Sequence, residues 1–285
     1  RAPSDRLFDA ERARPEVDGP PGRDLHRPAV REGRRLPVGR RDRRTVRGTA
    51  IEHPEALIAA ADGEVRLGHR PIGVVDRDSP SAPLRFFPVP PCYVFHPLNA
   101  FDDGDAVVLD VVKYARLPLF DPTEQPEPVT QDESVVGKLT RLRLDLRTGE
   151  LTETQLDATP CEFPVCDPRY AMRPYRYGWL AARVGETCGR GQFNALGYAD
   201  LQTGTVRHRV LGRSSYVSEV LFVPRGPGVP EGDGYLLGTV FHAEAGQSDL
   251  VIWDAQQVDA EPVAVLQTRQ RVPFGFHGTW VPSDS

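Results

Sequence analysis

No run of apolar residues in this sequence approaches the roughly 18 consecutive positions that a membrane-spanning helix needs. No secretory signal peptide is recognisable at the start of the chain. The four cysteines, at positions 92, 161, 166 and 188, are too few and too irregularly spaced for a disulfide framework in 285 residues. We therefore expect reduced cysteines and a cytoplasmic protein, and the sequence leaves peripheral contact with a membrane open.

Common catalytic and metal-binding motifs are also missing. HExxH, a CxxC pair, a Walker loop, GxSxG and an EF-hand loop do not occur. Cys161 and Cys166 are five positions apart and no second Cys/His pair follows closely, which is poor spacing for zinc. Cysteine ligation of a metal is therefore not expected.

Lysine is absent from residues 1–50, which hold 14 arginines, eight acidic residues and six prolines. This segment carries a formal charge of +6, so residues 51–285 carry −11 of the net −5. A basic arm could bind nucleic acid or an anionic membrane. However, Phe8 is its one aromatic residue and no strand or helix period is visible. The pattern favours a disordered or non-native segment, because GC-rich codons that are read out of frame give arginine- and proline-rich sequence without periodicity. No nucleic-acid partner is expected.

Long amphipathic helices are absent as well, and the best helical stretch, 54–61, is short. From about residue 84 short apolar runs alternate with turn residues. The runs are rich in Val, Leu, Tyr and Phe and are bounded by Gly, Pro, Asp or Thr-Gly, which indicates an all-β protein. The predicted strands are 106–114, 138–146, 176–184, 193–201, 206–211, 217–223, 234–243, 248–254 and 262–268.

One repeat is visible among these strands. An apolar strand ends at an aspartate that begins a turn in LRLDLRTGEL (142–151), LGYADLQTGTV (196–206) and, more weakly, LVIWDAQQ (250–257). The aspartates Asp145, Asp200 and Asp254 are 55 and 54 residues apart. Although such hairpins occur in any β protein, a period near 50 residues with about four strands is typical of a propeller blade.

Two of the seven histidines, His96 and His277, lie in apolar and aromatic surroundings. Taken singly, each is more typical of a core histidine bonded to a carbonyl. A buried neutral imidazole is nevertheless what an iron or zinc site needs. In a propeller the innermost strands converge on the axis, so histidines far apart in sequence can meet there.

Four blocks of sequence resemble the carotenoid cleavage oxygenase family, in the family's order over about residues 70–285. The first is CYVFHPLNAFDDGDAVVLDVVKY around His96, and the second is CEFPVCDPRYAMRPYRYGWLAA. The third is SEVLFVPR, and the fourth runs from DGYLLGTVFHAEAGQSDLVIWDA to PVAVLQTRQRVPFGFHGTWV and contains His277.

This resemblance implies a seven-bladed propeller with a ferrous ion, Fe(2+), held by four histidines. His96 and His277 fall on the third and fourth ligand positions, and Glu162 and Glu219 match two of the three glutamates that orient such imidazoles. Family members insert both atoms of dioxygen into a carbon–carbon double bond and release two carbonyl products. The implied substrate is an apolar conjugated carotenoid, apocarotenoid or stilbene, reached through an apolar tunnel.

The first two ligand histidines have no match. His26 lacks an aromatic, strand-like setting, His53 falls where the family has a connection without a ligand, and His69 lies where the chain rejoins the family pattern. His208 and His242 lie in strands that should not reach the axis. Residues 51–285 supply four or five blades at about 50 residues each. We therefore interpret 51–285 as the C-terminal part of an oxygenase-like propeller, an incomplete one. The alternative is a truncated or frameshifted, inactive propeller fragment that binds no iron, whereas a lactonase with an acidic calcium site is disfavoured because no matching carboxylate cluster is present.

Overall fold

The computed structural model describes residues 48–50, 71–76, 81, 83–118, 135–185, 191–273 and 275–281. Within them the chain forms fifteen β-strands and one short 3-10 helix, which confirms the all-β prediction. The expected helical stretch 54–61, the arginine-rich residues 1–47, and His26, His53 and His69 lie outside the described residues. No described helix is long and apolar enough to span a membrane.

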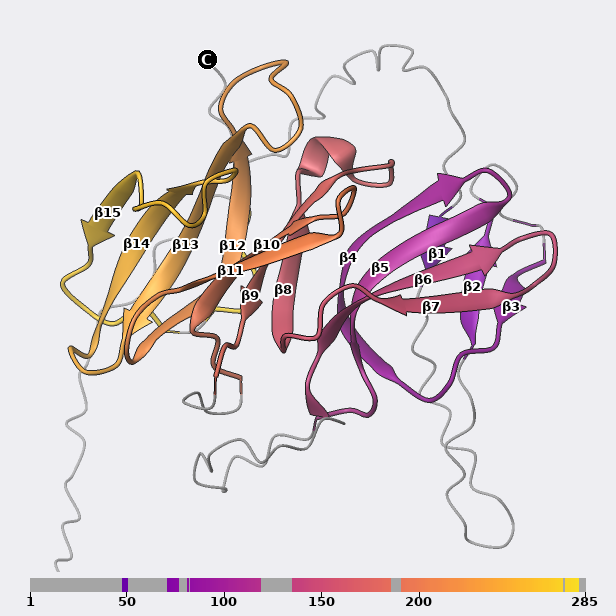
Figure 1. Ribbon diagram of the computed structural model, residues 1–285, viewed down its shortest axis with the longest axis horizontal. Coiled ribbons are helices and arrows are strands. Elements are labelled where there is room, and N and C mark those ends of the chain that lie inside the picture. Colours follow the sequence, from indigo (N-terminus) through magenta and orange to yellow (C-terminus); the bar gives the residue numbers. More distant parts are fainter. Residues whose placement is uncertain are drawn as a thin grey trace, which may run out of the picture. The chain divides into compact units, whose positions relative to one another are not determined.

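The strands of this part of the chain form four antiparallel sheets, labelled in Figure 1. One sheet has three strands in the order β1-β2-β3, and each of the others is a four-stranded meander: β4 to β7, β8 to β11 and β12 to β15. Four sheets agree with the predicted incomplete propeller of four to five blades. The strand bounds are β1 Gly48–Ala50, β2 Ile72–Val75, β3 Arg85–Phe87, β4 Tyr93–Asp103, β5 Ala106–Tyr114, β6 Lys138–Asp145, β7 Leu151–Gln155, β8 Cys161–Cys166, β9 Tyr177–Ala182, β10 Ala195–Asp200, β11 Thr205–Val210, β12 Ser215–Pro224, β13 Gly234–His242, β14 Gln247–Asp254 and β15 Ala264–Gln267, with the 3-10 helix η2 at Pro168–Tyr170.

The aspartate repeat marks the same place in three sheets. Asp145, Asp200 and Asp254 end β6, β10 and β14, the third strand of each meander. In each case the Oδ1 atom accepts a hydrogen bond from the backbone N–H two residues later, at 2.8, 3.1 and 2.9 Å respectively. This Asx geometry begins the turn to the last strand, so the 54–55-residue period is the repeat of the blade.

Hydrophobic side chains fill the spaces between successive sheets. One cluster joins β2 and β3 to the β4–β7 sheet, a second joins that sheet to β8–β11, and a third joins β8–β11 to β12–β15. In the third cluster the Trp179 ring stacks on Phe222 with centroids 4.8 Å apart, and its indole N–H donates to the Ala255 carbonyl at 2.8 Å. A buried aromatic pair with a satisfied polar atom is a strong link between two sheets.

The first strand of each meander positions the residues of interest. Strands β4, β8 and β12 each form an edge of their sheet, and β8 contacts both of the others. Pro97 in β4 and Pro164 in β8 fit this placement, since proline has no N–H to donate to a further strand and is confined to edges and bulges.

Candidate functional site

His96, Glu162 and Glu219 each lie at an irregularity of one of these edge strands. The register of β4 shifts between Val94 and Pro97, that of β8 between Glu162 and Val165, and that of β12 between Val217 and Val220. Bulges of this kind re-aim side chains and are frequent beside functional sites. Each of the strands β4, β8 and β12 therefore carries one polar side chain at a point where the alternation of side chains between the two faces of the strand is interrupted.

The His96 imidazole is held by Glu162. Its Nδ1 atom lies 2.5 Å from Oε2 of Glu162, which also accepts the backbone N–H of Phe163 at 2.7 Å. The second oxygen, Oε1, accepts the Tyr114 hydroxyl at 3.0 Å. The side chain of Glu162 is 7% exposed and that of His96 24% exposed, so this pair is largely shielded from water.

His277 and Glu219 repeat the arrangement. Nδ1 of His277 lies 3.0 Å from Oε1 of Glu219, and Oε2 of Glu219 accepts the backbone N–H of Gly278 at 2.7 Å. His277 follows the last strand and is brought back to β12, the first strand of the same sheet. Its side chain is 56% exposed, more than twice the exposed fraction of His96.

The two imidazoles face each other. The Nε2 atoms of His96 and His277 are 3.2 Å apart, and their ring planes are inclined by 75°. Since each Nδ1 is directed at a carboxylate, its proton is assigned there and each Nε2 keeps its lone pair. The structure thus brings together all four residues that the sequence singled out, His96, His277, Glu162 and Glu219.

The electrostatics around His96 favour a positive charge. The hydrogen bond that Nδ1–H of His96 donates to Glu162 raises the pKa of His96, burial opposes this, and the charges of Glu162 and Glu219 raise the pKa further. Two nitrogen lone pairs 3.2 Å apart, each backed by a carboxylate, form an electron-rich site that suits a cation. In the described part of the chain no group of three or more His, Cys, Asp or Glu side chains is placed to hold a metal.

A largely apolar cavity of about 580 Å³ opens beside His96. Its lining comes from the edge strands β4, β8 and β12, from the end of β5 and from the connections around them. Phe163, whose φ of 51° is unusual for a non-glycine residue, places its ring 5.2 Å from the His96 ring and 6.0 Å from Phe193. The lining residues include Phe95, His96, Tyr114, Val135, Pro160, Glu162, Phe163, Arg183, Phe193, Val217 and Phe276. This volume is within the usual range for a small-molecule site.

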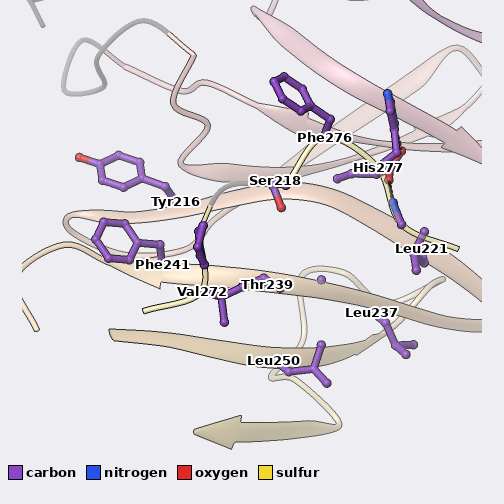
Figure 2. Close-up of a pocket in the computed structure, with 15 residues that line it drawn as sticks. Tyr216, Ser218, Leu221, Leu237, Thr239, Phe241, Leu250, Val272, Phe276 and His277 are labelled. Carbon is purple, nitrogen blue, oxygen red and sulfur yellow. Dashed lines mark hydrogen bonds and ion pairs between the residues drawn. The ribbon is translucent and has the colours of Figure 1, made fainter. Parts of the chain in front are cut away.

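A second, smaller pocket of about 270 Å³ lies beside the segment that carries His277 (Figure 2). It lies over β12, β13 and β14, with Tyr216 and Phe241 at one end and Leu221 and Leu237 at the other. Phe276 lines both pockets and is 80% exposed. The residues just before His277 therefore line two adjacent apolar spaces.

The remaining described histidines have other partners. Nε2 of His208 on β11 lies 2.9 Å from Oδ2 of Asp157, and His242 on β13 contacts Ser215 at 2.9 Å and Asp249 at 3.0 Å. The sequence reasoning missed Tyr114, because it stood as the last residue of an apolar strand. The signal that could have found it is a polar hydroxyl at a buried position of that strand.

Three sheets place their first strands around one histidine pair and repeat the same aspartate turn, an arrangement typical of β-propeller blades around a shared polar site. The chain matches the family described as Retinal pigment epithelial membrane protein over residues 68–282, and it belongs to that family, which is the carotenoid cleavage oxygenase family.

Curated relatives agree with this assignment. The chain is 34% identical over 197 residues to apocarotenoid-15,15'-oxygenase of Synechocystis sp., covering 69% of this chain and 40% of that protein. It is 34% identical over 220 residues to isoeugenol monooxygenase of Pseudomonas putida, covering 73% and 45%. It is 32% identical over 219 residues to carotenoid cleavage oxygenase of Mycobacterium tuberculosis, covering 74% and 42%. The chain therefore spans less than half the length of these relatives.

Solved structures show the same fold. The cobalt-substituted apocarotenoid oxygenase of Synechocystis superposes with a TM-score of 0.68 at 32% identity, covering 75% of this chain and 44% of that one. A mutant of the same Synechocystis protein gives a TM-score of 0.69 at 32% identity, covering 76% and 45%. The expectation of a propeller of this family is confirmed.

Proposed function

We propose that this chain carries part of the iron site of a non-haem dioxygenase, with His96 and His277 as ligands and Glu162 and Glu219 as the carboxylates that orient them. The observation that supports it is the opposition of the two Nε2 atoms at 3.2 Å, with both Nδ1 atoms already occupied. Metal-bound histidines typically donate their second ring nitrogen to a carboxylate in this way.

The distance between the nitrogens fits a shared metal ion. Imidazole nitrogens lie about 2.0–2.1 Å from a bound transition-metal ion. Two such ligands at an angle between the octahedral and tetrahedral values are then roughly 2.8–3.4 Å apart. The observed separation of 3.2 Å falls in that interval, and neutral imidazole suits iron as well as zinc, copper and nickel. Fe(2+) is part of the proposal, whereas the structure of a relative contains cobalt.

When bound, ferrous iron would supply the redox chemistry that activates dioxygen. The protein's own residues perform the other tasks. Glu162 and Glu219 hold both imidazoles in one tautomer, and the cavity beside His96 keeps water away from an apolar substrate. Phe163 and Phe193 provide aromatic surface on which a conjugated chain or ring can lie.

We infer that the substrate is an apolar conjugated molecule, a carotenoid, apocarotenoid or stilbene-like alkene, cleaved at a carbon–carbon double bond. Each carbon of the broken bond receives one atom of dioxygen, so that one alkene and one O₂ give two carbonyl products. The names of the relatives include apocarotenoid and carotenoid oxygenases and an isoeugenol monooxygenase, which supports this range. The cytoplasmic location and the division of the chain at residue 50 stay predictions. Peripheral contact with a membrane stays open.

The test is anaerobic titration of the chain with Fe(2+), followed by incubation with isoeugenol, a stilbene or an apocarotenal under ¹⁸O₂. We expect one iron per chain, and label in both carbonyl products. His96→Ala and His277→Ala should each abolish iron binding and the formation of labelled products. His242→Ala is the matched control, since that imidazole contacts Ser215 and Asp249 instead.

Two outcomes contradict the proposal. A wild-type chain that binds no iron is the result expected of an inactive propeller fragment. Iron binding that persists unchanged in both histidine variants would place the metal elsewhere.

A further inference from the structure

A third side chain stands behind the Glu162–His96 pair. Tyr114 is the last residue of β5 and is 6% exposed. Its hydroxyl donates to Oε1 of Glu162 at 3.0 Å, while Oε2 of the same carboxylate is 2.5 Å from Nδ1 of His96. With the backbone N–H of Phe163, three donors surround one carboxylate, and one of them is the imidazole.

The phenol is the donor in its contact with Glu162. Burial, and then the neighbouring Glu162 charge, raise the pKa of Tyr114 well above its ordinary value. The hydroxyl therefore stays protonated across the physiological pH range. A hydrogen bond to an ionised acceptor is roughly twice as strong as one between neutral groups, so losing it releases one end of the carboxylate.

Packing fixes the ring of Tyr114 as well as its hydroxyl. The ring meets Phe95 edge to face with centroids 5.4 Å apart. On the side of Gly137 there is no room for a further atom, since a Cβ on that residue would fall 2.6 Å from Cζ of Tyr114. The hydroxyl is thus aimed by the fold and does not have to search for the carboxylate.

The second half of the site is held differently. Glu219 accepts from His277 and from the backbone N–H of Gly278, and its side chain is 16% exposed against 7% for Glu162. A buried side-chain donor is therefore part of the support for His96, whereas the support for His277 comes from the main chain beside it.

We propose that Tyr114 is a positioning residue for His96: by holding Oε1 of Glu162 it directs Oε2 at Nδ1, and so keeps the Nε2 lone pair aimed at His277. This rests on the proposed function only in giving that lone pair a metal to bind. The orientation of the imidazole itself is a property of the protein without metal.

The experiment compares Tyr114→Phe with Tyr175→Phe in the full chain. Both substitutions remove a phenol that donates to a carboxylate, and the acceptor of Tyr175 is Asp110, at 2.6 Å. The metal-free measurement is the tautomer of His96 from the ¹⁵N signals of its ring nitrogens, at a fixed pH above the range in which imidazoles are protonated. We expect the Nδ1–H form in the wild type and in Tyr175→Phe, and a mixture of tautomers in Tyr114→Phe, with the His277 signals unchanged.

The second measurement is the affinity for Co(2+), followed by its visible absorption. Loss of a partner outside the ligand shell weakens metal binding about 10–100-fold, and for Tyr114→Phe we expect about tenfold. In a Glu162→Ala background the same substitution should cause no further loss, because the group through which it acts is gone.

The proposal is overturned if a folded Tyr114→Phe protein keeps the wild-type His96 tautomer and Co(2+) affinity. It is also overturned if the loss of affinity is equally large in the Glu162→Ala background, or if the His277 signals move as much as those of His96. A wild-type chain that binds no Co(2+) would refute the metal site, and the tautomer measurement would then decide on Tyr114 by itself.

Discussion

His96 and His277 are 181 residues apart in the chain and their Nε2 atoms are 3.2 Å apart in space. The connection is made by three sheets whose first strands contact one another in sequence, β4 with β8 and β8 with β12. Each imidazole takes its carboxylate from a different strand, so neither half of the pair is local in sequence. The site therefore depends on how successive sheets pack against one another, and a change that shifts one blade relative to the next should disturb it.

The two carboxylates should differ in their importance for metal binding. Glu162→Gln and Glu219→Gln each weaken the acceptor of an Nδ1–H, for which a loss of about 10–100-fold in affinity is expected. Glu162 should give the larger loss, because its contact is shorter, 2.5 against 3.0 Å, and its side chain is less exposed. Co(2+) titration of both variants measures the difference. A larger loss of affinity in Glu219→Gln than in Glu162→Gln would show that shielding of the carboxylate from water does not determine how much it contributes to metal binding.

Gly137 should tolerate no side chain. A Cβ there would lie 2.4 Å from Cγ1 of Val112, 2.6 Å from Tyr114 and 2.8 Å from the backbone oxygen of Cys161. Overpacking a core typically costs about 1–3 kcal/mol, so Gly137→Ala should lower the free energy of unfolding by that amount and weaken metal binding as well. Urea unfolding and Co(2+) titration measure the two effects.

Gly73→Ala is the control for that variant. Its Cβ would make only ordinary contact, 3.4 Å from the Phe86 ring. We expect no loss of stability there. A Gly137→Ala protein as stable as Gly73→Ala would mean that the close contacts around Gly137 relax without cost.

Much of the fold could be predicted from local pattern. The aspartate turns at Asp145, Asp200 and Asp254 repeat at nearly equal spacing because each ends the third strand of a meander, and the side-chain chemistry of that turn is local. The strand predicted at 106–114 coincides with β5, and that at 217–223 lies inside β12. Alternating or continuous apolar runs indicate such strands well.

The strands that carry the site were harder to predict. β4 and β8 were not among the predicted strands, since Pro97 and Pro164 interrupt their apolar pattern. Proline counts against a strand unless the strand is known to be an edge, and edge position is a property of the sheet. β7, at Leu151–Gln155, was missed because its residues are mostly polar and exposed.

The site itself came partly from the resemblance and partly from contacts that no spacing reveals. His96 and His277 stand out by their apolar and aromatic surroundings, whereas Glu162, Glu219 and the roles of all four come from the resemblance; the structure places the four together. The role of Tyr114 depends on the contact of β5 with β8, which belong to two different sheets. Sequence separation between Tyr114 and Glu162 is 48 residues, with no motif linking them.

A buried ion pair near β5 should be important for stability. Asp110 is fully buried and accepts two hydrogen bonds from Arg141, both at 2.8 Å, and one from the Tyr175 hydroxyl. Arg141→Ala leaves that carboxylate without its counter-charge, which typically costs about 3–5 kcal/mol. Chemical unfolding at neutral pH measures the loss.

Arg143→Ala serves as the comparison, two residues along the same strand. Its partner Asp103 is 57% exposed and Arg143 itself is 45% exposed, so this pair should contribute less than about 1 kcal/mol. Equal losses in the two arginine variants would contradict the view that burial of Asp110 sets the cost.

Asp200 should make the stability of the chain depend on pH in the acidic range. Hydrogen bonds from Arg176, at 2.9 and 2.6 Å, and the backbone N–H groups of Gln202 and Thr203 lower the pKa of Asp200 from 3.8 to about 2. A carboxyl group whose pKa is lower in the folded state stabilises that state above the unfolded pKa. This contribution is present above about pH 4 and is lost as the pH falls towards 2. Its size is reduced by solvent screening, because the Arg176 side chain is 39% exposed.

Asp200→Asn removes this titration while keeping an oxygen that can accept the turn hydrogen bonds. The variant should be less stable than the wild type at neutral pH, and the difference should shrink steadily between about pH 4 and pH 2. Thermal unfolding of both proteins at a series of pH values measures it. A difference that stays constant over that interval would mean that Arg176 contributes through packing of its side chain and not through the charge of Asp200.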